Sequence, residues 1–155
     1  MKHRIFTTWM VMMCLFALLS ACKKVDNKAS SNTGESKFSN VVEDVETRMY
    51  EDKISNLEEM TLQDYKSILK NKVILSDEYF YFGRKSCPVC RNFVLSIKNF
   101  DSIDNLFYID TESMTKKDKD ELKEMKIEAV PAIFKIDITG KAIPITTTQF
   151  LKGVE

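Results

Sequence analysis

The chain has 155 residues, enough for one domain preceded by a short leader. Its 23 basic residues balance its 23 acidic residues, so neither a strongly basic nor a strongly acidic partner is indicated. No basic patch with interleaved aromatic side chains occurs, and nucleic acid is therefore not an expected partner.

The first 21 residues have the pattern of an export signal. A positive region opens the segment, formed by Lys2, His3 and Arg4. An uncharged apolar core follows over residues 5–19. The segment closes with the sequence Leu-Ser-Ala-Cys, whose cysteine is Cys22. This ending resembles the lipobox of bacterial lipoproteins. The resemblance implies cleavage after residue 21, lipid on Cys22, and a domain outside the cytoplasm that is anchored to the bacterial cell membrane. The alternative is an uncleaved anchor, although about 17 apolar or small residues is near the lower limit for spanning a bilayer.

Loss of the leader would leave two cysteines in the folded domain. Cys14 would leave with the leader and Cys22 would carry lipid, so Cys87 and Cys90 remain. Zinc needs about four ligands, and an iron–sulfur cluster also needs more cysteines. A c-type haem site needs His directly after the second cysteine, where Arg91 stands. We therefore expect no metal and no cofactor.

A polar segment separates the leader from the domain. Residues 23–40 are rich in Lys, Asn and Ser and cannot bury enough apolar surface to fold alone. We expect the lipidated cysteine and a flexible tether over residues 22–45, followed by a domain over residues 46–155. Residues 41–60 leave two possibilities open, a first helix or an edge strand near residues 53–55.

The rest of the chain alternates helical and extended patterns. Thr61 with Asp64, and Thr115 with Asp118, resemble capping boxes at helix starts. The expected helices and strands are a helix over residues 61–71, a strand over 78–83, a helix over 91–100, a strand over 105–110, a helix over 115–126, and a hairpin of strands 133–138 and 142–147. One or two helical turns remain at the end.

A pair of cysteines lies between the first strand and the following helix. In Ser86-Cys87-Pro88-Val89-Cys90 the two thiols are one helical turn apart and can close a small disulfide ring. Pro88 falls at the first helical position, which needs no backbone N–H. Cys87 would then occupy the helix N-terminus, where unpaired N–H groups favour a thiolate. Nearby positive charge from Arg84, Lys85 and Arg91 would add to this effect.

The order of these elements resembles the thioredoxin fold. Cys-X-X-Cys opens a helix, and Val130-Pro131 follows one strand, one helix and a loop later. The resemblance implies an α/β thioredoxin-like fold, with a central mixed sheet flanked by helices and a C-terminal helix that is short or missing. More narrowly, residues 81–93 look like the thioredoxin-like bacteriocin-transport accessory proteins of Gram-positive bacteria, which are thought to help exported peptides acquire disulfides.

The resemblance also implies roles for individual residues. Cys87 would react with a substrate thiol or disulfide through a mixed disulfide, and Cys90 would resolve it. Pro131 would be cis and lie against the cysteine pair, and the Val130 backbone would pair with an extended substrate peptide. Ser86, Pro88 and Val89 would support the turn into the helix. A trans proline at the start of an edge strand is the alternative for Pro131.

Three positions depart from the thioredoxin pattern. Tyr81 stands where thioredoxins carry a buried Asp, and Ser86 stands where they carry Trp. Val89 occupies the place of the His found in known oxidants, and a His there would stabilise the Cys87 thiolate. The direction of catalysis therefore stays open between oxidation or isomerisation, which the resemblance slightly favours, and reduction.

The function expected from these features is a membrane-anchored thiol–disulfide oxidoreductase. Its substrates would be thiols or disulfides of exported proteins or peptides, and a membrane redox partner would renew it. One alternative is a non-catalytic accessory lipoprotein that binds an export partner through a thioredoxin-like surface. A peroxide-reducing enzyme is less well matched, because the Thr and Arg of a peroxidatic pocket are not found. A purely structural bond between Cys87 and Cys90 would stabilise little, since so small a ring restricts the unfolded chain only slightly.

Overall fold

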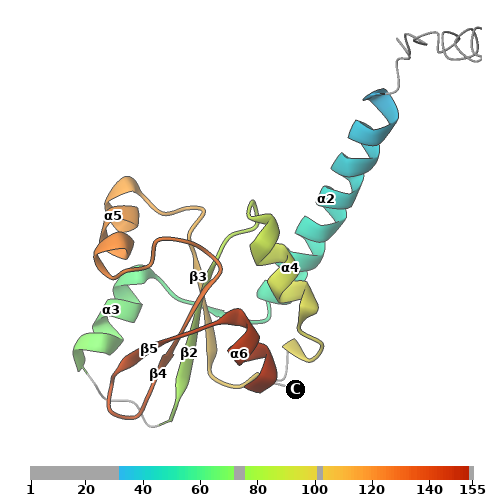
Figure 1. Ribbon diagram of the computed structural model, residues 1–155. Helices are drawn as coiled ribbons and strands as arrows, with labels where there is room; N and C mark the ends of the chain where they lie inside the picture. The colour runs from blue at the N-terminus through green and yellow to red at the C-terminus, as the bar shows by residue number, and fades with distance from the viewer. Residues whose placement is uncertain (1–31, 72–75, 101–102, 154–155) are drawn as a thin grey trace, which may run out of the picture. The chain divides into compact units, whose positions relative to one another are not determined.

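The computed structural model describes residues 32–71, 76–100 and 103–153 (Figure 1). Residues 37–155 form one compact unit, and of the other unit, residues 1–36, only the start of one helix is described. Cys22 and the leader lie outside the described residues, so their lipidation and cleavage stay predictions. Within the described ranges, no helix combines the length and apolar character needed to cross a membrane.

A mixed five-stranded sheet forms the centre of the domain. The strands are β1 (Glu58–Glu59), β2 (Glu78–Gly83), β3 (Leu106–Asp110), β4 (Ala132–Ile136) and β5 (Ala142–Ile145). They lie in the order β1-β3-β2-β4-β5. β3 runs parallel to both β1 and β2, whereas β4 is antiparallel to β2 and β5. This arrangement confirms the thioredoxin-like α/β fold expected from the sequence.

Helices cover both faces of the sheet. They are α2 (Asn32–Ile54), α3 (Leu62–Asn71), α4 (Pro88–Ser96), α5 (Lys116–Glu124) and α6 (Thr147–Gly153). Figure 1 shows α3 and α5 on one side of the sheet and α2, α4 and α6 on the other. The C-terminal helix α6 is short, as predicted, and it buries Phe150 against the sheet.

The central strand β2 supplies side chains to both cores because successive residues of a strand point to opposite faces. Phe80 and Phe82 are fully buried on the α3 and α5 side, where both rings meet the ring of Tyr65 at centroid distances of 4.9 and 5.2 Å. Tyr79 and Tyr81 point to the other face, where Tyr81 packs against the aromatic ring of Phe93 in α4. One strand thereby fixes the positions of helices on both sides.

The structure corrects the expected tether. Residues 32–45, which were expected in a flexible segment, lie in helix α2, and this helix continues through residues 53–54, where an edge strand was the alternative. The edge strand is instead β1, a few residues later. Tertiary contacts account for the difference, because the last turns of α2 bury Tyr50 and Ile54 in the core. Hydropathy of the isolated segment does not reveal these contacts.

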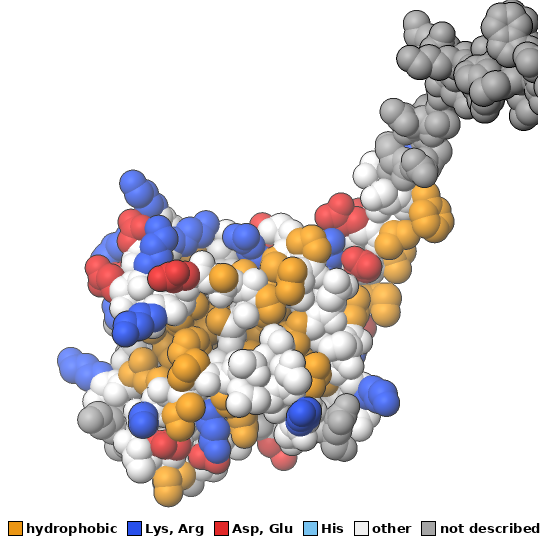
Figure 2. All heavy atoms as spheres, in the orientation of Figure 1, with side chains coloured by type: hydrophobic (Ala, Val, Ile, Leu, Met, Phe, Trp, Pro, Cys, Tyr) orange, Lys and Arg blue, Asp and Glu red, His pale blue; other side chains and the backbone are white. Residues whose placement is uncertain are grey.

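The preceding turns of α2 expose an apolar stripe. Large apolar side chains are exposed at five positions on this helix, namely Phe38, Val41, Val42, Val45 and Met49. Their spacing of three or four residues places them along one side of the helix, and Figure 2 shows apolar side chains gathered on this part of the surface. The stripe is an observed surface feature, separate from the core beneath Tyr50.

Two helix starts agree closely with the sequence. The Thr61 and Asp64 side chains each accept a hydrogen bond from the other's backbone N–H, at 3.1 and 2.9 Å, before α3. Thr115 and Asp118 form the same capping box before α5, at 3.2 and 3.0 Å. The helix after the first cysteine begins at Pro88, the predicted first helical position, and α4 ends at Ser96, before the expected end at residue 100.

We expect Phe80→Ala to lower the free energy of unfolding by about 3–5 kcal/mol, because it removes a fully buried ring from the centre of the sheet. Phe38→Ala is the matched control, since this ring is 72 % exposed. Urea denaturation followed by circular dichroism measures both. Equal losses in the two variants would contradict the burial described for β2.

Candidate active site

Helix α4 begins at the first cysteine of the pair. Cys87 is the N-cap residue, with extended backbone angles, and Pro88 opens the helix as the sequence predicted. The backbone N–H of Cys90 donates to the Cys87 sulfur at 3.3 Å. A helix N-terminus has several N–H groups without intrahelical partners, and this sulfur accepts one of them. The helix therefore orients its first cysteine through a direct contact.

The two thiols differ in their access to solvent. Both are free thiols here; Cys87 is 9 % exposed and Cys90 is fully buried. Val89, between them, lies exposed on the surface. A substrate sulfur can therefore approach Cys87, whereas Cys90 can be reached only from Cys87 or from the core. Within the described ranges, no group of three or more His, Cys, Asp or Glu residues is placed to hold a metal ion.

The loop before β4 lies against the cysteine pair. The Val130–Pro131 peptide bond is cis, as the resemblance implied, and the trans alternative is wrong. The thiol of Cys87 donates to the Val130 carbonyl oxygen at 3.7 Å. Residues 43 positions apart in the chain thus meet at one surface. The structure brings together Cys87, Cys90 and the Val130–Pro131 loop, and their chemical roles stay predictions.

The expected positive surroundings of Cys87 are largely neutralised. Lys85 pairs with Glu51 at 2.8 Å. The backbone N–H of Ser86 donates to a Glu112 carboxylate oxygen at 3.0 Å, which brings a negative group beside the turn. Carboxylates contributed by α2 and by the loop after β3 therefore offset a positive charge that the local sequence alone suggests.

Arg91 is a structural cation beneath the site, and its side chain is only 3 % exposed. Its guanidinium pairs with Glu43 at 3.3 Å and Glu46 at 3.5 Å, both in α2. It also donates to the Lys85 carbonyl oxygen at 2.9 Å. A buried charge is tolerated when it is paired and hydrogen-bonded, and here the pairing connects α2, α4 and the turn before Cys87.

The environment of Cys90 disfavours its thiolate. Burial raises the pKa of the Cys90 thiol to about 12, with a contribution from the neighbouring Cys87 sulfur. A backbone hydrogen bond from Arg84 and the hydroxyl of Tyr81 act in the opposite direction. Cys90 therefore holds its proton at neutral pH, so any reaction at its sulfur must also move that proton.

Three buried tyrosines meet behind Cys90. Tyr81 touches the thiol, Tyr50 comes from α2, and Tyr108 comes from β3. Burial raises the pKa of all three phenols, that of Tyr50 to about 12 and those of Tyr81 and Tyr108 further. The sequence showed that Tyr81 replaces an acid, but nothing in local spacing indicated that Tyr50 and Tyr108 would join it.

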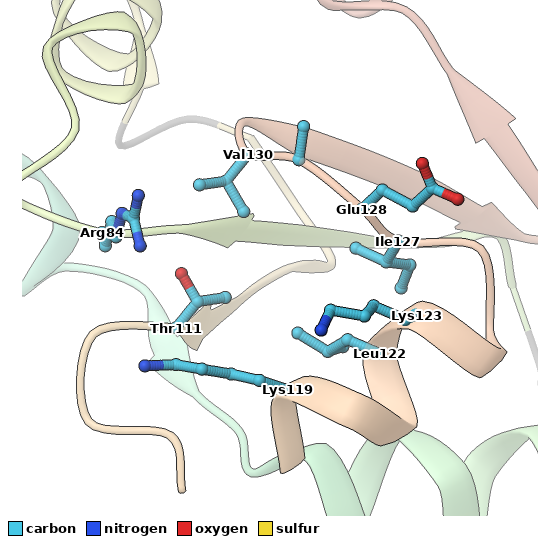
Figure 3. A pocket seen from close by; sticks show the side chains of 9 residues that line it. Arg84, Thr111, Lys119, Leu122, Lys123, Ile127, Glu128 and Val130 are labelled. Carbon is cyan, nitrogen blue, oxygen red and sulfur yellow. The ribbon is translucent and has the colours of Figure 1, made fainter. Parts of the chain in front are cut away.

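A cavity lies on the other side of the Val130 loop (Figure 3). Its volume is about 240 Å³, and its floor is formed by Leu122, Ile127 and Val130. Arg84, Lys119 and Lys123 lie at its rim, and Figure 3 shows the carboxylate of Glu128 pointing away. An extended peptide bound along Val130 would meet an apolar hollow with basic edges.

No known protein-family model matches the chain, and no curated protein matches it. Similar solved structures include the oxidised C-terminal domain of Neisseria meningitidis DsbD, at 17% identity and TM-score 0.42, covering 57% of this chain and 84% of that one. The J-Trx1 fragment of ERdj5 is similar at 12% identity and TM-score 0.42, covering 67% and 52%. The AhpF component of the alkylhydroperoxide reductase of Enterococcus faecalis is similar at 22% identity and TM-score 0.33, covering 57% and 43%.

This chain thus spans about half of the ERdj5 fragment and less of the reductase component.

We expect iodoacetamide to modify Cys87 and to spare Cys90 in the reduced, folded chain at neutral pH. Cys87 keeps 9 % of its surface exposed, whereas Cys90 is fully buried and its high pKa keeps it protonated. Because a raised thiol pKa is crossed only at alkaline pH, Cys90 labelling should increase toward high pH. Fragment-ion mass spectrometry distinguishes the two sites, and denatured protein, in which both should react, is the control. Equal labelling in the folded state would contradict the described geometry.

Proposed function

We propose that the protein is a thiol–disulfide oxidoreductase that acts through Cys87 and Cys90. The observation that carries this proposal is the placement of a cysteine with 9 % of its surface exposed at the N-cap of α4, with a fully buried cysteine one turn deeper and the Val130 carbonyl opposite. A bond needed only for stability would not require a helix N-terminus or an open approach to one sulfur.

The geometry supports a two-step exchange. In the oxidising direction, a substrate thiolate attacks the Cys87 sulfur of the disulfide and forms a mixed disulfide, and Cys90 leaves as the thiol after taking up a proton. A second substrate thiolate then displaces Cys87, so the substrate gains the disulfide and the protein keeps two thiols. Reduction follows the same steps in reverse, with Cys90 resolving the mixed disulfide.

The Val130–Pro131 loop supports a role in substrate binding. An extended peptide can form backbone hydrogen bonds with an exposed strand edge or loop, which gives affinity with little dependence on sequence. The Val130 carbonyl already lies within contact of the Cys87 thiol. A peptide bound here would present its own cysteine to the reactive sulfur, and its neighbouring side chains would reach the basic-edged cavity.

We further propose that the protein is lipid-anchored outside the cytoplasm and acts on exported proteins or peptides, in the oxidase or isomerase direction. The lipobox-like segment ending at Cys22 supports the anchor. An oxidant must be reoxidised, so a membrane redox partner is part of the proposal. The likeness of residues 81–93 to bacteriocin-transport accessory proteins supports exported peptides as one class of substrate.

We expect the Cys87/Cys90 pair to titrate in glutathione buffers with a reduction potential of about −180 mV or above, the range of isomerases and oxidants. The measurement uses the full chain with Cys14→Ser and Cys22→Ser, so that Cys87 and Cys90 are the only cysteines that titrate. A value near about −270 mV would reverse the proposed direction and leave the reaction class intact. A pair that stays oxidised below about −300 mV would contradict the enzyme proposal and favour the non-catalytic accessory protein.

We expect Cys22→Ser to abolish incorporation of radiolabelled fatty acid and to release the protein from the membrane fraction. Cys14→Ser is the matched control, because Cys14 lies within the proposed leader and its loss should leave labelling unchanged. Cell fractionation with lipid labelling measures both variants. Retention of Cys22→Ser in the membrane without lipid would contradict the lipid anchor and support an uncleaved membrane anchor.

A further inference from the structure

A continuous row of phenol hydroxyls leads from Cys90 toward the surface. The Tyr81 hydroxyl is hydrogen-bonded to the Cys90 thiol and lies 3.3 Å from the Tyr50 hydroxyl. Tyr50 donates to the Tyr108 hydroxyl at 3.5 Å, and Tyr108 donates to a carboxylate oxygen of Asp110 at 3.2 Å. The hydrogen bonds run toward the carboxylate from Tyr50 onward, whereas either hydroxyl of the Tyr81–Tyr50 pair can be the donor.

The far end of the row reaches an open cavity. This cavity has a volume of about 450 Å³, and Tyr50, Tyr108 and Asp110 all line it. Tyr81 and Cys90 do not line it and are buried. Water in the cavity can therefore exchange protons with Asp110 but has no direct access to the Cys90 thiol. The hydroxyls of Tyr81, Tyr50 and Tyr108 lie between the two.

The proposed exchange creates a need for such a connection. Cys90 must lose a proton when it resolves a mixed disulfide and must regain one when it leaves. Its thiol is buried, and it lines neither the cavity beside Val130 nor the cavity beside Asp110. Tyr81 is the hydroxyl in direct contact with the thiol.

We propose that Tyr81, Tyr50 and Tyr108 form a proton relay between the Cys90 thiol and Asp110, an inference that rests on the proposed exchange reaction. When Cys90 attacks the mixed disulfide, the Cys87–Cys90 bond forms and the substrate leaves as a thiolate. The Cys90 proton passes to the Tyr81 oxygen while Tyr81 passes its own proton to Tyr50. Tyr50 and Tyr108 do the same in turn, and the carboxylate of Asp110 takes the last proton.

The raised pKa values of the phenols fit this role. Burial keeps each tyrosine neutral at pH 7, so none of them can store the negative charge as a phenolate. A hydroxyl that accepts one proton while it releases another stays neutral throughout the transfer. Tyr81 contacts the reacting thiol and is the catalytic member, whereas Tyr50 and Tyr108 act through it as positioning and transfer residues.

Other hydrogen-bond partners near the row compete only partly with the contacts between its hydroxyls. The Tyr108 hydroxyl has a second acceptor, the Gly83 carbonyl oxygen, at 3.4 Å. That carbonyl already accepts from the backbone N–H and the hydroxyl of Thr111, at 2.9 and 3.0 Å. Asp110 also accepts from the backbone N–H groups of Glu112 and Ser113. Glu51, Glu59, Lys85 and Glu112 line the same cavity and surround the Asp110 end of the row.

Gly83 makes room for the first two hydroxyls. A Cβ at this position would overlap the Tyr81 hydroxyl and would lie 2.9 Å from the Tyr50 oxygen. Only a residue without a side chain therefore lets the two phenols meet beside the end of β2.

The experiment measures the resolving step alone. The reduced full chain, with Cys14→Ser and Cys22→Ser, is mixed with excess dithionitrobenzoate in a stopped-flow instrument. Attack by Cys87 releases a first thionitrobenzoate, and attack by Cys90 on the resulting mixed disulfide releases a second. We expect Tyr81→Phe, Tyr50→Phe and Asp110→Asn each to slow the second, concentration-independent phase by at least about tenfold at neutral pH and to leave the first phase unchanged.

Tyr65→Phe is the matched control, because it removes the hydroxyl of a buried tyrosine on the opposite face of the sheet. It should leave both phases unchanged. The deficit of Asp110→Asn should also shrink as pH rises, since hydroxide in the cavity can then take the proton from Tyr108, which lines it. A purely structural role would not give this rescue.

Three results would overturn the relay. These are a second phase at the wild-type rate in Tyr81→Phe or Tyr50→Phe, a second phase at the wild-type rate in Asp110→Asn, or an Asp110→Asn deficit that does not change with pH. Absence of the first phase would instead overturn the proposed function. If Tyr81→Phe unfolds at a lower temperature than the wild type, Tyr50→Phe provides the test, because the Tyr50 ring lines the open cavity.

Discussion

The central strand β2 is buried on both faces, and the rest of the domain is arranged by that constraint. Its phenylalanines hold α3 and α5 on one side, while its tyrosines face α2, α4 and α6 on the other. A one-residue shift in the strand would exchange these two sets of side chains. The same register carries the chain into the turn before Cys87, so the position of α4 follows directly from the packing of the sheet.

The α2 helix is a second determinant of the site, although it lies far from the cysteines in the sequence. It supplies the carboxylates that pair with the buried Arg91, and it supplies Lys53, which donates to the Ile97 carbonyl oxygen at 2.5 Å just after α4. Contacts near both ends of α4 are therefore made by the same neighbour, α2. Breaking a buried ion pair by removing one partner is costly because it leaves an uncompensated charge, so the acidic residues of α2 support the geometry around Cys87.

Local patterns in the sequence predicted much of the fold. The capping boxes at Thr61 and Thr115, the apolar strands, and Pro88 after Cys87 each depend on neighbours within a few residues, and these features appear as expected. The cis peptide before Pro131 was correctly inferred from a family resemblance. The catalytic roles assigned to the cysteine pair remain hypotheses to be measured.

Features that depend on distant contacts were not predicted. The first part of α2, up to residue 40, looked too polar to fold, and its continuation was left open between a helix and an edge strand, because partners such as Arg91 in α4 come later in the chain. The positive charge expected around Cys87 was overestimated for the same reason, since Glu51 and Glu112 reach the turn only in the folded state. The grouping of Tyr50 and Tyr108 behind Cys90 likewise follows from the pairing of β2 with β3 and from the docking of α2.

The close approach at Gly83 couples three positions in evolution. A larger residue there would displace the hydroxyl ends of Tyr81 and Tyr50. A lineage that loses these phenols, for example by placing a shorter side chain at position 81, is released from the requirement for glycine. Across homologous sequences, glycine at 83 should therefore accompany tyrosine at 50 and 81, and the three should be lost together. That covariation would mark the boundary of the subgroup that shares this buried arrangement.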